Sequence, residues 1–346
     1  GRGAAQAVGR AGGDRRRGAG NRSCCVTRFQ DYDVHKCGFW SQGPALLMTL
    51  NILEAAGIDR LTHGSDAYLH TIVEAIKLAF DDRNAWFGDP LFARIPAEGL
   101  LSKNYAKERA ALIGAQASLT HRYGYPWAHQ AGDKPAPAFV PHRLAPRGKP
   151  TGDTTAIEVV DARGNLFSCT PSSGWLAGGA YIAGDTGVPM SNRLTVFDLD
   201  PASPNVLAGG KRPRTTLTPT IVTRGGKPFL AVGTPGGDTQ DQHILQTLLN
   251  VILGKQNLQQ ALESPRVESA HFHESFADKP DAPGQLLIER RIPSATITAL
   301  MSRGHRVEPV SSYGIGTAGV AVGLDPRFGT LRGGADIRGE RHVFGW

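Results

Sequence analysis

Hydrophobic positions in the first half of the chain recur with the spacing of helices. Leucines and isoleucines follow one another every three to four residues over 43–56, and Gly57 ends that pattern. Residues 65–87 carry a longer helical pattern, with Ser65 placed as its N-cap, and residues 102–114 carry a third. Six prolines then fall within 122–153, which predicts a linker or a long exposed loop.

From Asp153 onward the pattern is typical of strands joined by tight turns. Residues 155–160 and 166–170 flank a turn at 161–165, and this predicts a hairpin. A second hairpin and further elements follow: strands at 219–223 and 228–233, helices at 239–253, 256–263 and 292–303, and strands at 305–310 and 318–323. This order predicts layered α and β elements and not alternating βαβ units.

The positive charge of the sequence is concentrated at its N-terminus. The formal net charge is +7, but residues 1–28 hold seven arginines and one acid, so the body is nearly neutral. Residues 1–30 have no apolar core of a secretory signal, and they predict a disordered basic tail or the product of an upstream gene-start error. A neutral body does not favour a nucleic-acid partner, and the sequence has no apolar run of 18 residues to cross a membrane.

Three motifs have simple explanations. Gly314–Gly319 matches GxGxxG, but a strand pattern follows it where a dinucleotide site needs a helix, so we expect a glycine turn. His271 and His273 have no third ligand in an HExxH or similar spacing, which favours surface or packing roles over a metal site. The four cysteines have no CxxC spacing. We therefore expect neither a cofactor nor a metal.

Hydroxyl and glycine residues form a more informative set. The segment Thr151-Gly-Asp-Thr-Thr155 precedes the first hairpin, and Lys211-Arg-Pro-Arg-Thr-Thr-Leu-Thr-Pro219 places hydroxyls beside cations. Thr234-Pro-Gly-Gly237 joins a predicted strand to a predicted helix. Backbone N–H groups of a glycine pair near a helix N-terminus are suited to stabilise an oxyanion.

Together these segments resemble the γ-glutamyltranspeptidase family of N-terminal-nucleophile hydrolases, from Tyr32 to the C-terminus. The matching blocks are YDVHKCGFWSQGP (32–44), EAIKLAFDDRNAWFGDP (74–90), DTTAIEVVDARGN (153–165), NRLTVF (192–197), KRPRTTLTPTIV (211–222), GTPGGD (233–238) and ESPRV (263–267). The resemblance implies an α+β fold, a four-layer αββα sandwich that is incomplete at its N-terminus. It divides the chain into the tail 1–30, the C-terminal part of a large-subunit region (31–153) and a small-subunit region (154–346).

The resemblance also implies a set of site residues. Self-cleavage between Asp153 and Thr154 frees Thr154 as an N-terminal nucleophile, whose α-amine can act as general base. By position, Gly236 and Gly237 form the oxyanion hole and Ser172 supports the nucleophile. Thr170 and Thr155 are further candidates, for which strand packing is the alternative. Thr215 and Thr216 replace a serine pair that holds the substrate α-carboxylate.

Three departures from the family pattern bear on the substrate. Arg193 and Val196 stand where the family has the Gln and Asp that bind the substrate ammonium, and Gly174 stands where it has an Asn. A guanidinium pairs with carboxylates. The substrate is therefore a γ-glutamyl amide such as glutathione, or an amide of a glutaryl- or oxamate-type acyl group that lacks the α-amine.

The upstream segment of the relatives has no counterpart in this sequence. A non-catalytic remnant is thus a third hypothesis, and the compartment, the periplasm included, stays open. The partners expected for an enzyme are an amide substrate and the chain's own two fragments, held together as a heterodimer.

Overall fold

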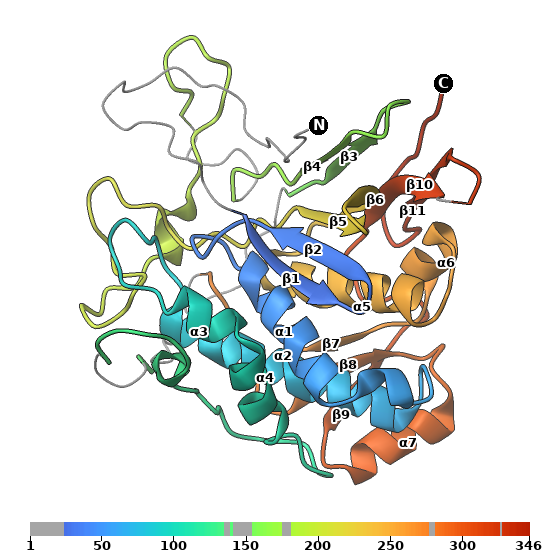
Figure 1. The fold of residues 1–346 in the computed structure, drawn as a ribbon, viewed down its shortest axis with the longest axis horizontal. Helices are drawn as coiled ribbons and strands as arrows, with labels where there is room; N and C mark the ends of the chain where they lie inside the picture. The colour runs from blue at the N-terminus through green and yellow to red at the C-terminus, as the bar shows by residue number, and fades with distance from the viewer. Residues whose placement is uncertain (1–23, 135–138, 141–153, 175–180, 277–280, 326) are drawn as a thin grey trace.

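The computed structural model describes residues 24–134, 139–140, 154–174, 181–276, 281–325 and 327–346. At its centre lies a six-stranded antiparallel sheet in the order β1-β2-β5-β6-β10-β11 (Figure 1). Its strands are β1 (Cys25–Phe29), β2 (Tyr32–Lys36), β5 (Thr220–Arg224), β6 (Lys227–Gly233), β10 (Val320–Asp325) and β11 (Thr330–Ala335). Residues far apart in the sequence thus meet in one sheet, since β2 pairs with β5.

Layers cover the two faces of this sheet. The hairpin of β3 (Ile157–Val160) and β4 (Leu166–Cys169) lies over one face, against β5, β6 and β10. Helices α1 (Gly43–Ala55) and α5 (Gln240–Ile252) lie against the other face, with α2 (Asp66–Trp86) behind α1. Beyond α2 lies a second sheet, made of β7 (Val267–Ser269), β8 (Gln285–Glu289) and β9 (Arg306–Val310).

Local sequence signals explain where the helices begin. Pro44 stands in the first turn of α1, and the Ser65 hydroxyl caps α2 by accepting from the N–H of Tyr68 at 3.2 Å. The remaining helices are α3 (Ala97–Leu101), α4 (Lys103–Ala110), α6 (Leu258–Glu263) and α7 (Ser294–Ser302), with short 3-10 turns at η1 (Ile58–Arg60), η2 (Pro126–His129), η3 (Arg193–Val196) and η4 (Gly237–Thr239). No described helix is long and apolar enough to span a bilayer.

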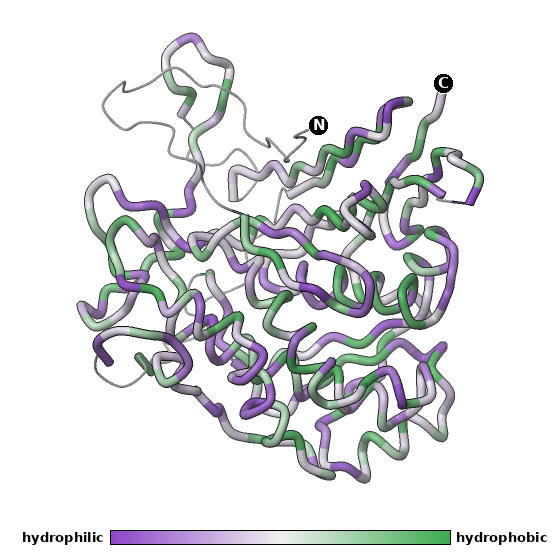
Figure 2. Tube along the Cα trace, in the orientation of Figure 1, coloured by the Kyte–Doolittle hydropathy of each residue, from purple (hydrophilic) through white to green (hydrophobic). Residues whose placement is uncertain are grey.

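The hydrophobic core lies between the central sheet and its helices. Figure 2 shows the apolar stretches running through the centre of the molecule, while α4 is largely hydrophilic. The outward face of the β3–β4 hairpin differs, because Ile157, Val159 and Phe167 remain 46–48% exposed there. Among the described residues, no helix covers this face.

The structure corrects the sequence predictions at several places. The basic tail does not extend to residue 30, because Cys25–Phe29 forms β1, in which Thr27 and Phe29 point inward; residues 1–23 lie outside the described part. The third helix ends at Ala110 and not at residue 114. The sequence patterns also missed α3, β2, β7, β8 and β11, each of which has only three to six residues. The predicted hairpins and the helices α1, α2 and α5 are confirmed to within two residues of their bounds.

Candidate active site

Thr154 lies just before β3, at the start of the hairpin that covers the central sheet. The N–H of Thr155 donates to the carbonyl of Pro171 at 3.1 Å, which ties this segment to the chain that follows β4. Thr154 Oγ1 is consequently held 3.0 Å from Ser172 Oγ. Asp153, the other side of the predicted cleavage site, lies outside the described residues.

Ser172 is the centre of a small hydrogen-bond network. Its hydroxyl oxygen accepts from the N–H of Gly174 at 3.0 Å and from Nη2 of Arg193 at 2.9 Å. The Thr154 hydroxyl also donates to Ser172 Oγ, at 3.0 Å. Ser172 therefore fixes the position of the candidate nucleophile relative to Gly174 and Arg193.

Arg193 extends this network away from Thr154. It lies in η3, is 6% exposed, and donates from Nη1 to Thr216 Oγ1 at 3.3 Å. Its guanidinium also lies 5.5 Å from the centre of the Phe276 ring. A buried cation is therefore linked to the candidate nucleophile through one residue, Ser172.

Two predicted residues do not join this network. The Thr215 hydroxyl oxygen accepts from the N–H of Leu217 at 3.2 Å, and its backbone pairs with Trp40 and Gln42. Thr170 is buried, and among the described residues its hydroxyl has no hydrogen-bond partner. Thr170 therefore fits the packing alternative, whereas Thr215 lies outside the network of Ser172 and Arg193.

The glycine pair lies on the tight turn between β6 and η4, directly before α5. Gly236 has φ +128° and Gly237 has φ +57°, conformations that glycine adopts without strain. Within the described part of the chain, neither glycine N–H donates a hydrogen bond, while the carbonyl of Gly237 accepts from Gln42 Nε2 at 3.2 Å. Two unused N–H groups at a helix N-terminus are what an oxyanion hole needs.

Thr154 and the glycine pair line the same cavity, which has a volume of about 730 Å³. Its wall is formed by Thr154, Gly174, Pro235, Gly236, Gly237, Asp238, Thr239, Glu268, Ser269, Ala270, Phe272, Glu274, Phe276, Gln285, Leu287, Glu308, Gly316, Thr317 and Arg341. The cavity is large enough for an amide with a substantial acyl or amine group.

Gly174 and its neighbour Asn192 show how this site departs from the family pattern. A Cβ atom built on Gly174, which has φ +102°, would overlap Asn192 Oδ1. An Asn at position 174 would therefore have to displace the Asn192 side chain and adopt a backbone conformation that favours glycine. Val196, at the other departing position, is fully buried and presents no polar group.

A buried ion pair holds the turn that contains Gly236 and Gly237. Asp238 follows Gly237 and pairs with Arg83 of α2, which also donates to Gln42 Oε1 at 2.9 Å. Burial acts to raise the pKa of Asp238, but Arg83 and the hydrogen bonds from Ser275 outweigh it, and the pKa is lowered. Asp238 is thus charged, and together with Gln42 it fixes the turn to α2.

His121, His271 and His273 form a cluster that differs from the surface location considered in the sequence analysis. His271 and His273 are buried, so the surface interpretation is wrong; both pack against the His121 ring, with centroids 4.9 and 4.6 Å apart. Aspartates absent from the sequence argument lie beside them, since His121 bridges Asp81 at 2.7 Å and Asp281 at 3.0 Å.

These groups are poorly arranged as metal ligands. Nδ1 of His271 accepts from the N–H of Gly284 at 3.0 Å, which leaves the proton on Nε2 and removes that nitrogen as a ligand. The rings of His121 and His273 are stacked at 21°, so one ion cannot lie in the plane of both. The cluster fits the packing interpretation.

Comparisons with known proteins show which family this chain belongs to. The sequence profile of the family described as Gamma-glutamyltranspeptidase matches residues 20–346. The chain belongs to the gamma-glutamyltranspeptidase family. Its relatives include the Glutathione hydrolase-like YwrD proenzyme of Bacillus subtilis (36% identical over 320 residues, 92% of this chain and 54% of the relative) and the Acylase ACY 1 proenzyme of Pseudomonas sp. strain V22 (32% identical over 300 residues, 87% and 47%).

The fold agrees with that of solved gamma-glutamyltranspeptidase relatives. The cephalosporin acylase from Bacillus halodurans superposes with a TM-score of 0.77 at 28% identity, over 94% of this chain and 53% of that one. The α+β prediction is thereby confirmed, with β3–β4 and the central sheet as the two facing β layers and with α1 and α5 as the helical layer that the described residues contain. The chain spans about half the length of the curated relatives it matches.

Proposed function

We propose that this chain is the nucleophile-bearing part of a γ-glutamyltransferase-like amidohydrolase that cuts itself between Asp153 and Thr154. The observation that carries the proposal is the placement of Thr154. Its hydroxyl contacts Ser172 and lines the same cavity as the unused N–H groups of Gly236 and Gly237.

The proposed self-cleavage has two steps. The Thr154 hydroxyl oxygen attacks the carbonyl carbon of Asp153, the C–N bond breaks, and the hydroxyl proton passes to the departing nitrogen, which gives an ester on Oγ1. Water then hydrolyses that ester, which leaves a carboxylate on Asp153 and a free α-amine on Thr154. An α-amine with a pKa of about 7.7–8.0 is well matched to act as a base near neutral pH.

The same groups then act on an amide substrate. The α-amine takes the Thr154 hydroxyl proton as Oγ1 attacks the acyl carbon, and Gly236 and Gly237 bind the oxyanion through their N–H groups. The tetrahedral intermediate collapses when the leaving amine receives the proton. Water releases the acyl group from Oγ1 in hydrolysis, and an acceptor amine does so in transfer.

The first substrate candidate is a γ-glutamyl amide of the glutathione type, as the names of several relatives indicate. The second is an amide of a glutaryl- or oxamate-type acyl group. Arg193 favours this second class, because its guanidinium and Thr216 can hold a carboxylate, whereas a cation at this point repels an α-ammonium.

Self-cleavage is tested by intact mass and N-terminal sequencing. The wild-type chain should give two fragments that separate between Asp153 and Thr154. Thr154→Ala should remain whole, and Thr154→Ser should still cut because it keeps the hydroxyl. A wild-type chain that remains whole, or one that is cut equally in Thr154→Ala, would reject the proposal and favour the non-catalytic hypothesis.

The acyl preference is tested by comparing glutaryl and γ-glutamyl anilides. Arg193→Gln should lower kcat/KM for the glutaryl anilide roughly tenfold to a hundredfold, because a charge-assisted hydrogen bond contributes about 1.5–3 kcal/mol. Arg163→Gln, on the exposed turn of the β3–β4 hairpin, removes the same charge as a control. Unchanged glutaryl turnover in Arg193→Gln would exclude a carboxylate-binding role.

A further inference from the structure

Thr317 packs directly on the glycine turn. It lies in the turn before β10, whose first residue, Val320, pairs with Gly233 at the end of β6. This pairing brings Thr317 beside Gly236, so closely that a Cβ atom built on Gly236 would overlap the Thr317 methyl carbon. The position of that methyl group therefore limits where the backbone of Gly236 can lie.

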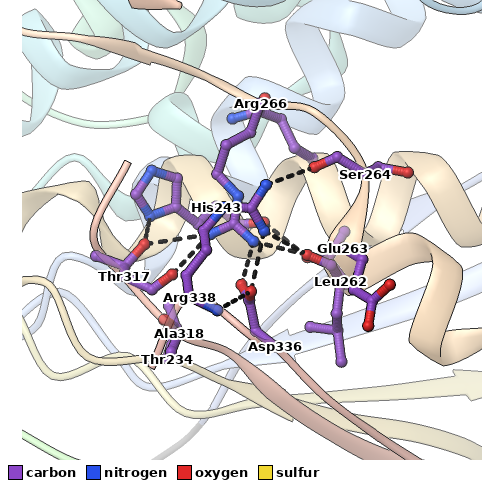
Figure 3. A network of polar contacts seen from close by, with 12 residues as sticks. Thr234, His243, Leu262, Glu263, Ser264, Arg266, Thr317, Ala318, Asp336 and Arg338 are labelled. Atoms are coloured by element: carbon purple, nitrogen blue, oxygen red, sulfur yellow. Dashed lines mark hydrogen bonds and ion pairs between the residues drawn. The ribbon is translucent and has the colours of Figure 1, made fainter. Parts of the chain in front are cut away.

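The Thr317 hydroxyl is held in turn by His243 of α5. Figure 3 shows Thr317 Oγ1 directed at Nδ1 of His243, and the other ring nitrogen, Nε2, lies 3.1 Å from Glu268 Oε2. Burial lowers the pKa of His243, so the ring is neutral. With its single proton on Nε2, facing the Glu268 carboxylate, His243 presents a lone pair at Nδ1, and the Thr317 hydroxyl donates to it.

Arg266 contacts Thr317 on the side opposite to His243. Its Nη1 donates to the Thr317 carbonyl at 2.9 Å and to Thr317 Oγ1 at 3.3 Å. Arg266 is itself fixed by an ion pair with Asp336, which also pairs with Arg338 at 3.0 Å. The Thr317 hydroxyl thus donates to one buried side chain and accepts from another, and these partners determine its rotamer.

We propose that Thr317 is a positioning residue that holds Gly236 in the geometry of the oxyanion hole, with Glu268 and His243 fixing its rotamer. Glu268 and Thr317 both line the candidate catalytic cavity, and His243 stands on the helix that follows the glycine turn. The role in turnover rests on the proposed function, whereas the effect on the turn does not.

The test replaces the hydroxyl by a methyl group of similar size. In Thr317→Val that methyl must withdraw from Nδ1 of His243, because a carbon needs a longer contact than a hydrogen-bonded oxygen. Since the oxyanion forms only in the tetrahedral state, kcat should fall about tenfold or more while KM stays within about twofold. Thr247→Val is the matched control, because it removes a buried hydroxyl from α5 that bonds the His243 carbonyl at 3.0 Å.

A double variant shows whether the two side chains act as one unit. If they do, His243→Asn with Thr317→Val should lower kcat no further than the more severe single variant does. A kcat of Thr317→Val equal to that of Thr247→Val, or losses that multiply in the double variant, would overturn the proposal.

Amide hydrogen exchange provides a readout that needs no turnover. Peptides covering residues 234–239, in which the Thr239 N–H donates to the Gly236 carbonyl at 3.1 Å, should exchange faster in Thr317→Val than in the wild-type or Thr247→Val chains. Faster exchange in a chain that shows no activity would support the positioning role of Thr317, and only the proposed function would then be in question. Unchanged exchange in these peptides would overturn the positioning role.

Discussion

Gly236 and Gly237 are adjacent, yet the structure predicts very different consequences for an alanine at each. At Gly236, with φ +128°, an added Cβ lies well within 3.0 Å of the Thr317 methyl carbon. At Gly237, with φ +57°, the nearest atom is Phe276 Cε2 at 3.4 Å, which is an ordinary contact. The two substitutions add the same atom to the same turn, and each serves as the control for the other.

The magnitudes follow from these contacts. In Gly236→Ala the Thr317 methyl must retreat by about 1 Å to restore a normal separation, and the backbone conformation adds about 1–3 kcal/mol of strain. Loss of one oxyanion donor costs about 2.7–4 kcal/mol in the transition state, or roughly a hundredfold to a thousandfold in kcat. Gly237→Ala costs about 1–2 kcal/mol of stability for a left-handed residue, and it leaves Thr317 in place.

The assay measures kcat and KM for an acyl anilide, together with the thermal midpoint of each variant. We expect Gly236→Ala to lose at least about tenfold more in kcat than Gly237→Ala, with KM similar in the two. Combining Gly236→Ala with Thr317→Ala, which removes the obstructing methyl, should return part of the lost stability. Equal kcat losses in the two glycine variants would refute the reasoning, because the Thr317 contact would then have no bearing on the oxyanion hole.

Two further predictions concern pH. Burial acts to lower the pKa of His121, but the hydrogen bonds and charges of Asp81 and Asp281 outweigh burial and raise the pKa. The stability that the protonated His121 contributes to the folded chain is therefore complete below the pKa of the unfolded state, and it is lost as pH rises through the pKa of the folded state. His121→Gln should therefore lower the thermal midpoint most near pH 5.5 and least near pH 9; an equal loss at both would exclude the bridge. Burial, with the nearby charge of Lys77, lowers the pKa of His305 to about 3, so the native state loses stability as pH falls from about 6.5 toward 3. His305→Gln should flatten this acid limb in urea unfolding, and parallel curves would contradict the assignment.

The elements that the sequence predicted well are those in which one periodicity extends over many residues. Residues 65–87 illustrate this, because the long helical pattern and the Ser65 cap agree with α2. By contrast, β7 has three residues and β1 follows an arginine-rich segment, so neither shows a clear alternation of its own. Strand pairing across some 180 residues, as between β2 and β5, has no local signal at all.

The candidate site divides in the same way. Thr154, Gly236 and Gly237 stand in blocks that resemble the family, so their positions could be named from the sequence. Ser172 could also be named as the residue that supports the nucleophile, but its contact with Arg193 could not, because their two segments meet only in the fold. Thr317 and His243 belong to no motif, and their pairing depends on the register of β10 against β6.

The pairing of β2 with β5 has a consequence for the proposed cut. Cleavage before Thr154 places β1, β2, α1 and α2 on one product and the other four strands of the central sheet, with α5, on the other. The two products then share one sheet and one core, so we expect them to copurify and to separate only on unfolding. Folding before the cut is unimolecular, whereas reassembly afterwards is second order and depends on concentration. If the proposed cut takes place, the chain therefore has to fold before it is cut, and its separated products would regain the native structure only in a slower, concentration-dependent step.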